Sequence, residues 1–480
     1  MTTITEQQTG SEIPTLSTNK TLQTLKAIVD PIGYYRSCFE AHPGVVRVHM
    51  SPTLPAQQVL INDPKMLKEL IASDSGSKVQ APGSLNGLLA QVVGEESILM
   101  LEPQTHKSRR KLLTPPFHGE RLKVYGQLII KLTNQVMGKI SPGEVIDARR
   151  VMKQITMRVI LTAVFGICEG ERYQRLEALM HQSLEMRSGP LGNLLLFFPL
   201  LRMDAGAWSP GRKLQTLEQD IRQLLFDQIA ERRDAINADP LNNQGVDVLS
   251  LLLSCRDEQG HGLSDSELHD ELQTLLIAGH ETTATALTWA LYWLHRDPMV
   301  LQRVRQELSK TERPIDPEQI NRLPYLGAVV NEVLRIHPVA MLMFPRRVEQ
   351  PITMAGYRFK PGDVLLGCIQ ALHERDDIFP NPQCFEPERF LAKNFNQNEF
   401  MPFGGGARRC IGAALAIYEM KLVLSKILEK FTFELCPESD CEIKPSRRGF
   451  TLGPSKPVRL KVKEIGCCQL AAKEVAAQKE

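Results

Sequence analysis

The stretch Phe403-Gly404-Gly405-Gly406-Ala407-Arg408-Arg409-Cys410-Ile411-Gly412 is the most informative part of this sequence. One cysteine stands in a glycine-rich loop, and an apolar helical pattern follows it from Ala413 to Leu428. A cysteine binds a soft or borderline metal as the thiolate, and the free N–H groups and dipole of a helix N-terminus stabilise that anion. The glycines let the backbone approach a flat, bulky group. A single cysteine is more often a small core residue, but the complete pattern favours a metal ligand.

The pattern Phe-x-x-Gly-x-Arg-x-Cys-x-Gly is met by Phe403, Gly406, Arg408, Cys410 and Gly412, and it resembles the haem-thiolate loop of the cytochrome P-450 family. This resemblance implies a haem b cofactor whose proximal iron ligand is Cys410. It also implies that Arg408 pairs with a haem propionate and that Phe403 packs near the sulfur. Gly404 and Gly412 would then lie against the cofactor.

Composition describes an ordinary globular protein: 480 residues, a formal net charge of +2 and 23% charged residues. The sequence contains no block of five or more basic residues that would indicate nucleic-acid binding. Ten cysteines lack paired metal spacing, and no signal peptide is evident, so we expect reduced thiols and a cytoplasmic location. The polar segment from Met1 to Lys20 contains no run near the ~20 apolar residues of a spanning helix. We therefore expect a soluble, bacterial-type protein without a transmembrane anchor.

The resemblance implies a mainly α fold with a small β-rich lobe, as a single domain over residues 26–463. We expect a flexible N-terminal segment over 1–25 and a C-terminal tail over 464–480, and we expect a monomer. Extended patterns predict strands near 45–50, 59–61, 352–366, 431–435 and 457–462. Residues 81–94, rich in glycine, predict a long loop, and helical periodicity dominates from 104 to 235.

A very long helix is predicted from Asp265 to Arg296, with a capping box at Ser264-Asp265-Ser266-Glu267. Its middle reads Ala278-Gly279-His280-Glu281-Thr282-Thr283, where the Thr282 hydroxyl would donate to the carbonyl of Ala278. The resemblance implies that this is the oxygen-binding groove, in which Glu281 and Thr282 deliver protons. His280-Glu281 could begin the His-Glu-x-x-His motif of zinc proteases, but position 284 is alanine, so the second histidine of that motif is missing. His280 is expected to be structural or solvent-facing.

Basic residues for the haem propionates are expected on two further segments. His106 and Arg110 are four apart and share one helix face; taken alone, they also suit an exposed basic helix. The resemblance assigns them to the propionates. It assigns Arg346 to the same role, with Arg347 as the alternative.

Glu332 and Arg335 share one face of an otherwise apolar helix. An exposed ion pair of this spacing would contribute little to the stability of the fold, whereas the charges of a buried pair must be fully hydrogen-bonded. The resemblance completes it with Arg389 of Pro387-Glu388-Arg389-Phe390, as a structural triad that holds the cysteine loop.

The resemblance implies a monooxygenase that uses O₂ and two electrons, drawn ultimately from NAD(P)H through a ferredoxin or flavodoxin with its reductase. A basic patch of Lys107, Arg109 and Arg409 is expected to dock that partner, with Arg408 occupied by a propionate. Two alternatives stay open, a non-catalytic haem sensor and an H₂O₂-dependent peroxygenase. The residues that the resemblance places on the pocket walls are apolar, so the substrate is expected to be a fatty acid, a terpenoid or a steroid-like molecule. These residues are Leu85, Leu88, Ile277, Val339, Met341, Leu342, Met343, Phe450 and Leu452.

Overall fold

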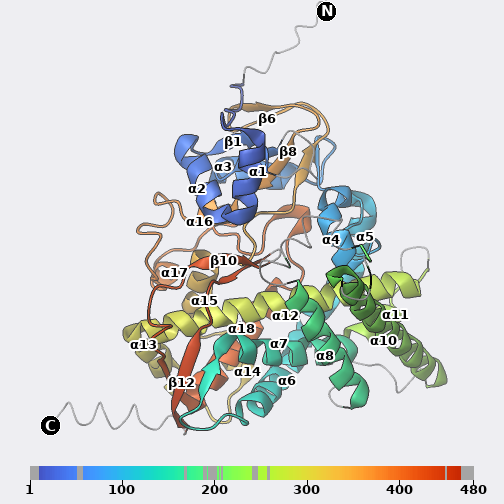
Figure 1. Cartoon of the computed structure of the whole chain (residues 1–480), viewed down its shortest axis with the longest axis vertical. Coiled ribbons are helices and arrows are strands. Elements are labelled where there is room, and N and C mark those ends of the chain that lie inside the picture. The colour runs from blue at the N-terminus through green and yellow to red at the C-terminus, as the bar shows by residue number, and fades with distance from the viewer. Residues whose placement is uncertain are drawn as a thin grey trace, which may run out of the picture.

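The computed structural model describes residues 10–50, 58–166, 170–187, 192, 203–204, 206, 209–239, 247–256, 260–448 and 451–465. They form a helix-rich body with a lobe of short strands at one end (Figure 1), which confirms the predicted fold class. The α-helices are α1 (Lys20–Val29), α2 (Pro31–Ala41), α3 (Pro64–Ser73), α4 (Gly87–Val93), α5 (Pro103–Leu113), α6 (Glu120–Met137), α7 (Ala148–Phe165), α8 (Glu171–Met186), α10 (Pro210–Ala238), α11 (Val248–Ser254), α12 (Asp265–Arg296), α13 (Pro298–Ser309), α14 (Pro317–Asn321), α15 (Pro324–Ile336), α16 (Ile369–His373), α17 (Arg389–Ala392) and α18 (Ala413–Lys430).

The strands are short and belong to four sheets. They are β1 (Val45–Val48), β2 (Gln58–Ile61), β3 (Val79–Gln80), β4 (Val145–Asp147), β5 (Arg346–Val348), β6 (Ile352–Met354), β7 (Tyr357–Phe359), β8 (Val364–Gly367), β9 (Phe431–Leu435), β10 (Pro445–Arg448), β11 (Thr451–Pro454) and β12 (Arg459–Ile465). In the described part of the chain, no helix is long and apolar enough to cross a membrane.

Helix α12 crosses the middle of the molecule (Figure 1) and has the bounds that the sequence predicted. The predicted capping box is confirmed, because the Ser264 hydroxyl accepts from the Glu267 N–H while the Glu267 carboxylate accepts from the Ser264 N–H. Every side chain from 283 to 292 is buried. A helix that is covered on all sides is a core helix, so α12 is the element against which the others pack.

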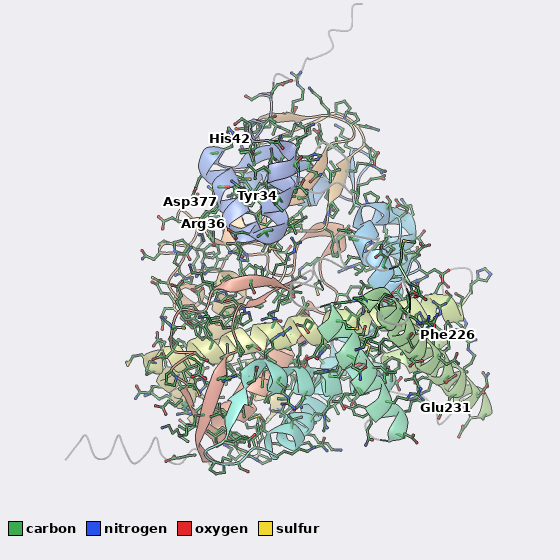
Figure 2. All side chains as sticks on the ribbon, viewed as in Figure 1. Tyr34, Arg36, His42, Phe226, Glu231 and Asp377 are labelled. Atoms are coloured by element: carbon green, nitrogen blue, oxygen red, sulfur yellow. The ribbon has the colours of Figure 1, made fainter. Side chains whose placement is uncertain are left out.

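The largest sheet, in the order β1-β2-β8-β5-β3, forms the lobe. Strands β2 and β8 run parallel, and the other neighbours are antiparallel. Helix α2 packs on α16, and Arg36 of α2, labelled with Tyr34 in Figure 2, pairs with Glu374 across 3.0 Å. The sheet carries β5, whose first residue, Arg346, faces the large cavity described below.

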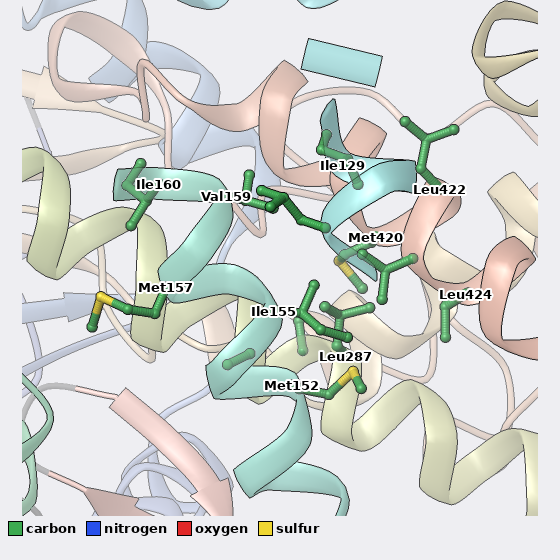
Figure 3. Packing of buried hydrophobic residues seen from close by; sticks show 14 of the residues in the cluster. Ile129, Met152, Ile155, Met157, Val159, Ile160, Leu287, Met420, Leu422 and Leu424 are labelled. Atoms are coloured by element: carbon green, nitrogen blue, oxygen red, sulfur yellow. The ribbon is translucent and has the colours of Figure 1, made fainter. Parts of the chain in front are cut away.

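The main core lies where α6, α7, α12 and α18 meet, as Figure 3 shows. Ile129, Ile155, Leu287 and Leu424, one from each helix, are all fully buried. Each such side chain contributes about 1.5–3 kcal/mol through its removal from water. This packing fixes α18, which directly follows the cysteine loop, against α12.

Two expectations for local structure were wrong. Residues 81–94 form a 3₁₀ turn and α4 rather than a long loop, because Val92 and Val93 bury their side chains and α4 packs against α12. The described part of the predicted flexible segment, from Gly10 onward, is structured. Ser11 pairs with Tyr357, and Asn19 caps α1 by accepting from the backbone N–H of Thr21.

Candidate functional site

A cavity of about 1120 Å³ lies between α12 and the cysteine loop. Most of the predicted site residues face it, although they come from five separate stretches of the chain. The predicted residues on its wall are Leu85, Leu88, His106, Arg110, Ile277, Ala278, Glu281, Thr282, Val339, Leu342, Met343, Arg346, Phe403, Gly404, Arg408, Cys410 and Gly412.

Two predicted pocket residues are placed differently. Met341 points into the core cluster that contains Cys38 and Leu366, and Leu452 is buried in the same cluster. Neither lines the cavity, because both side chains are buried in this cluster instead. Phe450 lies outside the described residues.

The cysteine loop is shaped by its glycines. Gly404 and Gly406 have φ angles of 65° and 68°, a region that residues with a side chain rarely adopt. At Gly406 a Cβ would come within 2.0 Å of the Asp74 carboxylate, which accepts from the N–H of the next residue, Ala407. The Cys410 N–H donates to the carbonyl of Phe403 at 3.0 Å and closes the loop. The loop therefore presents the cysteine in one fixed orientation.

The Cys410 thiol faces the cavity rather than bulk solvent, so burial raises its pKa. The Gly412 N–H at the start of α18, together with Arg110 and Arg409, acts in the opposite direction and lowers that pKa. The Gly412 N–H is one of the anion-stabilising groups that the sequence predicted at this helix N-terminus, whereas the contributions of Arg110 and Arg409 were not predicted.

Four basic side chains converge on the same side of the cavity. Burial, followed by the charges of Arg408, Arg110 and Arg346, lowers the pKa of His106 to about 3, so this imidazole is neutral. Burial also lowers the pKa of Arg110 and brings that of Arg408 to about 10. Within the described part of the chain, no carboxylate pairs with Arg110 or Arg408. Arg110 and Arg408, two desolvated cations without a paired carboxylate, fit a ligand with carboxylates, which is what the propionates of a haem provide.

Two of these arginines already have protein partners. Arg408 donates to the carbonyls of Ala81 and Ile98, at 2.6 and 2.8 Å, and also to that of Leu101. Arg346 pairs with Asp74 at 2.9 Å and donates to the carbonyl of Gly405. The alternative, Arg347, pairs with Glu349 and does not line the cavity. Propionate binding by His106, Arg110, Arg346 and Arg408 stays a prediction.

On α12, Thr282 donates its hydroxyl to the carbonyl of Ala278, as the sequence predicted. Glu281 pairs with Arg149 and, at 2.7 Å, with Lys153. Burial alone would raise the pKa of Glu281, but Lys153 and Arg149 outweigh it and lower that pKa. The side chain is therefore a carboxylate at neutral pH. His280 is buried and bonds the Thr156 hydroxyl at 2.9 Å, which fits its structural reading.

The Glu332–Arg335–Arg389 arrangement has the predicted geometry. Arg335 forms two hydrogen bonds to Glu332, at 2.7 and 2.8 Å, and Arg389 a third at 3.1 Å. Glu332 is fully buried and Arg335 is 1% exposed. The remaining Arg335 donors reach the carbonyls of His373, Pro382 and Cys384, so the buried charge is fully hydrogen-bonded.

Sequence reasoning missed three residues at this site. His373 accepts from the Met401 N–H at 3.1 Å, and its other ring nitrogen lies 3.2 Å from the Arg335 carbonyl, so it joins the buried ion pair to the start of the cysteine loop. Asp74 holds the loop as described above. Glu419 of α18 lines the cavity, and burial raises its pKa to about 8. No local pattern marks these residues, because their neighbours are distant in the sequence.

The expected basic docking patch is smaller than predicted. Arg109 is 5% exposed and pairs with Glu267 and Glu271 of α12, so its assignment to the surface was wrong. Lys107 and Arg409 are exposed.

The family model described as cytochrome P450 matches residues 22–462 of this chain. The chain is 31% identical over 432 residues to a protein of Mycobacterium tuberculosis provisionally named cytochrome P450 135B1, covering 90% of this chain and 87% of that one. It is 33% identical over 402 residues to another of that species, provisionally named cytochrome P450 137, covering 84% and 80%. A Mycobacterium bovis protein provisionally named cytochrome P450 138 is 32% identical over 377 residues, covering 78% and 80%. With the cysteine loop and the α12 groove on one cavity, these similarities show that the chain belongs to the cytochrome P450 family of haem-thiolate monooxygenases.

Proposed function

We propose that this enzyme hydroxylates a lipophilic small molecule, with electrons that pass from NAD(P)H through a reductase and a ferredoxin or flavodoxin. Family membership supports the reaction class. One observation carries the proposal: Cys410 of the loop and the Glu281–Thr282 pair of α12 line the same largely apolar cavity. A thiolate and a proton-handling pair around one largely apolar cavity suit O₂ activation next to a C–H bond.

Cys410 would hold the iron of haem b as a thiolate, and the cluster of His106, Arg110, Arg346 and Arg408 would face its propionates. Bound haem supplies the activation of O₂ and the transfer of one oxygen atom to the substrate. The contribution of the chain is to orient the cofactor, exclude water and move protons.

Thr282 and Glu281 would handle those protons in different ways. The Thr282 O–H donates to Ala278, so its oxygen lone pairs are left to accept from a water molecule in the cavity and orient it. Glu281 is ionised between Arg149 and Lys153. It would accept a proton from the solvent side and pass it on after releasing one of these cations.

Replacement of Thr282 by alanine is expected to preserve cofactor content and substrate binding while lowering the product formed per NAD(P)H by about 10-fold or more. A methyl group cannot orient the water, so electrons end in H₂O₂ instead. The measurement determines the product formed, the NAD(P)H consumed and the H₂O₂ released in the same reaction. Thr288→Ala is the matched control, because Thr288 makes the same back-bond, to Ala284 at 2.7 Å, but does not line the cavity. Unchanged coupling in Thr282→Ala would refute the assignment of this hydroxyl.

The reaction type is tested by comparing H₂O₂ alone with a ferredoxin and its reductase. The proposal expects turnover only with the electron-transfer proteins. Efficient turnover with peroxide alone would identify a peroxygenase, and ligand binding without turnover in either assay would favour a sensor.

The substrate class is supported by the walls of the cavity. Leu85, Leu88, Ile277, Val339 and Leu342 supply apolar surface, and apolar walls favour an apolar ligand. Fatty acids, terpenoids and steroid-like rings all satisfy this requirement. Difference spectra with a panel of these compounds would identify which class displaces water from the iron.

Reduction by a small acidic electron-transfer protein is expected to slow by roughly 10-fold as ionic strength rises from low to high salt, since salt screens steering by exposed cations. Lys107→Glu and Arg409→Glu should slow reduction at low salt, as measured by stopped flow. Lys430→Glu is the control, because Lys430 is exposed at the far end of α18, about 26 Å along the helix. A rate that does not respond to salt would rule out this docking surface.

A further inference from the structure

Strand β10 places two adjacent arginines, Arg447 and Arg448, on the wall of the cavity. Successive side chains of a strand point to opposite sides. Arg447 turns toward α1 and donates to the carbonyl of Ala27 at 3.0 Å. Arg448 turns toward α12: its Cδ and the Cγ2 of Thr285 lie 3.1 and 3.7 Å from the position that a Cβ would take at Gly453. The two arginines therefore reach different parts of the cavity.

The hairpin of β10 and β11 fixes the direction of the Arg448 side chain. Nε and Nη2 of Arg448 both donate to the carbonyl of Pro454, at 3.3 and 2.7 Å. Strand β11 packs against α12, and the N–H of Leu452 donates to the carbonyl of Val339, which also lines the cavity. Within the described residues, Nη1 of Arg448 has no hydrogen-bond partner. One edge of the guanidinium is thus held by the hairpin, while Nη1 keeps its donors for a ligand.

Arg448 has no carboxylate of its own among the described residues. Burial, followed by the charge of Arg149, lowers its pKa, and the charges of Glu281 and Asp147 oppose that shift. Both of these carboxylates have nearer partners. Glu281 pairs with Arg149 and Lys153, and Asp147 caps α7 by accepting from the backbone N–H of Arg149 at 2.9 Å. A guanidinium stays charged at neutral pH, so Arg448 is a half-buried cation that lacks a counter-ion.

The other charged side chains on the cavity wall do not supply that counter-ion. Arg187 of α8 and Glu218 of α10 pair with each other. Burial raises the pKa of Glu419 to about 8, so this carboxyl is mostly neutral at pH 7. The haem propionates would face the separate cluster around His106. The positive charge at Arg448 is therefore left for the molecule that occupies the rest of the cavity.

We propose that Arg448 binds the carboxylate of the substrate, so that the substrate is a lipophilic carboxylic acid rather than a neutral hydrocarbon or alcohol. The inference rests on the proposed function, because it takes this cavity as the substrate pocket. It names the head group of the substrate and leaves the skeleton open. The N–H donors of a guanidinium match a carboxylate, and such charge-assisted bonds are stronger than neutral ones. The apolar walls, among them Leu85 and Leu342, would contact the skeleton.

The test measures Kd for matched acids and alcohols on the haem-loaded full chain, by titration calorimetry and by Soret difference spectra. The pairs are lauric acid with dodecanol, geranic acid with geraniol, and lithocholic acid with the corresponding alcohol. In the wild type, the acid of the pair that fits should bind more tightly than its alcohol. In Arg448→Gln, the Kd of that acid should rise by roughly 10- to 100-fold, while the Kd of the alcohol changes by less than about 3-fold.

The choice of variants separates charge from structure. Glutamine at 448 keeps an N–H donor for the Pro454 carbonyl and removes only the charge. Arg448→Lys keeps the charge without the forked donors, so the Kd of the acid should rise by only about 3-fold. Arg459→Gln is the control, because Arg459 of β12 is about half exposed, pairs with Glu438 and does not line the cavity. It should leave every Kd unchanged.

Equal affinities for acid and alcohol in the wild type would overturn the role of Arg448 and leave the proposed function intact. The same holds if Arg448→Gln weakens acid and alcohol equally, as a purely structural role would require. Should Arg448→Gln fail to fold, Arg448→Lys decides, and an unchanged Kd for the acid in that variant would count against the inference. If no acid and no alcohol of the three pairs binds the wild type, the lipophilic pocket itself is contradicted, and this inference with it.

Discussion

Replacing Cys410 by serine is expected to abolish the red-shifted Soret band of the ferrous–CO complex and to reduce monooxygenase activity to background. A neutral hydroxyl does not donate charge to iron as a thiolate does. The loop geometry should survive, because the Cys410 backbone bond to Phe403 and the Gly404 and Gly406 turns do not involve the sulfur. The measurements are the CO difference spectrum, the haem content and product formation.

Cys441→Ser is the control, since Cys441 is an exposed cysteine that does not line the cavity. It should keep the band, the haem content and the activity. A Cys410→Ser protein that retains the thiolate band would show that another cysteine is the ligand, and the assignment of the whole loop would then be wrong.

Arg335→Ala is expected to destabilise the fold by about 3–5 kcal/mol, because it leaves the fully buried Glu332 carboxylate without its main partner. It also leaves the carbonyls of His373, Pro382 and Cys384 without their donor. The free energy of unfolding of a domain is commonly only about 5–15 kcal/mol, so this substitution would remove a large part of it. Urea unfolding followed by circular dichroism measures the effect, and the rate of haem loss reports whether the cysteine loop loosens.

Arg303→Ala provides the matched comparison. Arg303 pairs with Glu388 at 2.7 Å, but both side chains are about half exposed, so its removal should cost under about 1 kcal/mol. If the Arg335 and Arg303 variants unfold at the same urea concentration, the buried ion pair does not have the structural role inferred for it.

The contacts that sequence reasoning found are local ones. The Thr282 back-bond spans four residues and the Glu332–Arg335 pair spans three, so helical geometry alone brings the groups together. The bounds of α12 followed from its capping box and Asp297-Pro298, which act within one turn of each end. The cysteine loop was recognisable because its glycines and its cysteine are contiguous.

Side-chain direction was where prediction failed. Arg109 and Arg110 are neighbours on α5 and point about 100° apart, so one turns to the carboxylates of α12 and the other to the cavity. Met341 and Leu342 are neighbours, but only Leu342 lines the cavity, whereas Met341 is buried in the core cluster against which Leu342 also packs. Which of the two faces the cavity depends on what packs against the segment, and the segment's own residues do not specify that.

The sequence by itself thus determined the family, the groove helix and the buried ion pair, because each is encoded by residues within one turn or one loop, and it predicts Cys410 as the ligand on the same local ground. Only the tertiary structure decided how these parts are held together. The Asp74–Arg346 pair joins residues 272 positions apart, His373 reaches Met401 across 28, and Asp270 reaches Glu96 across 174. Such partners meet only after the chain has packed, and a side chain that bonds a distant backbone group leaves no pattern in its own neighbourhood.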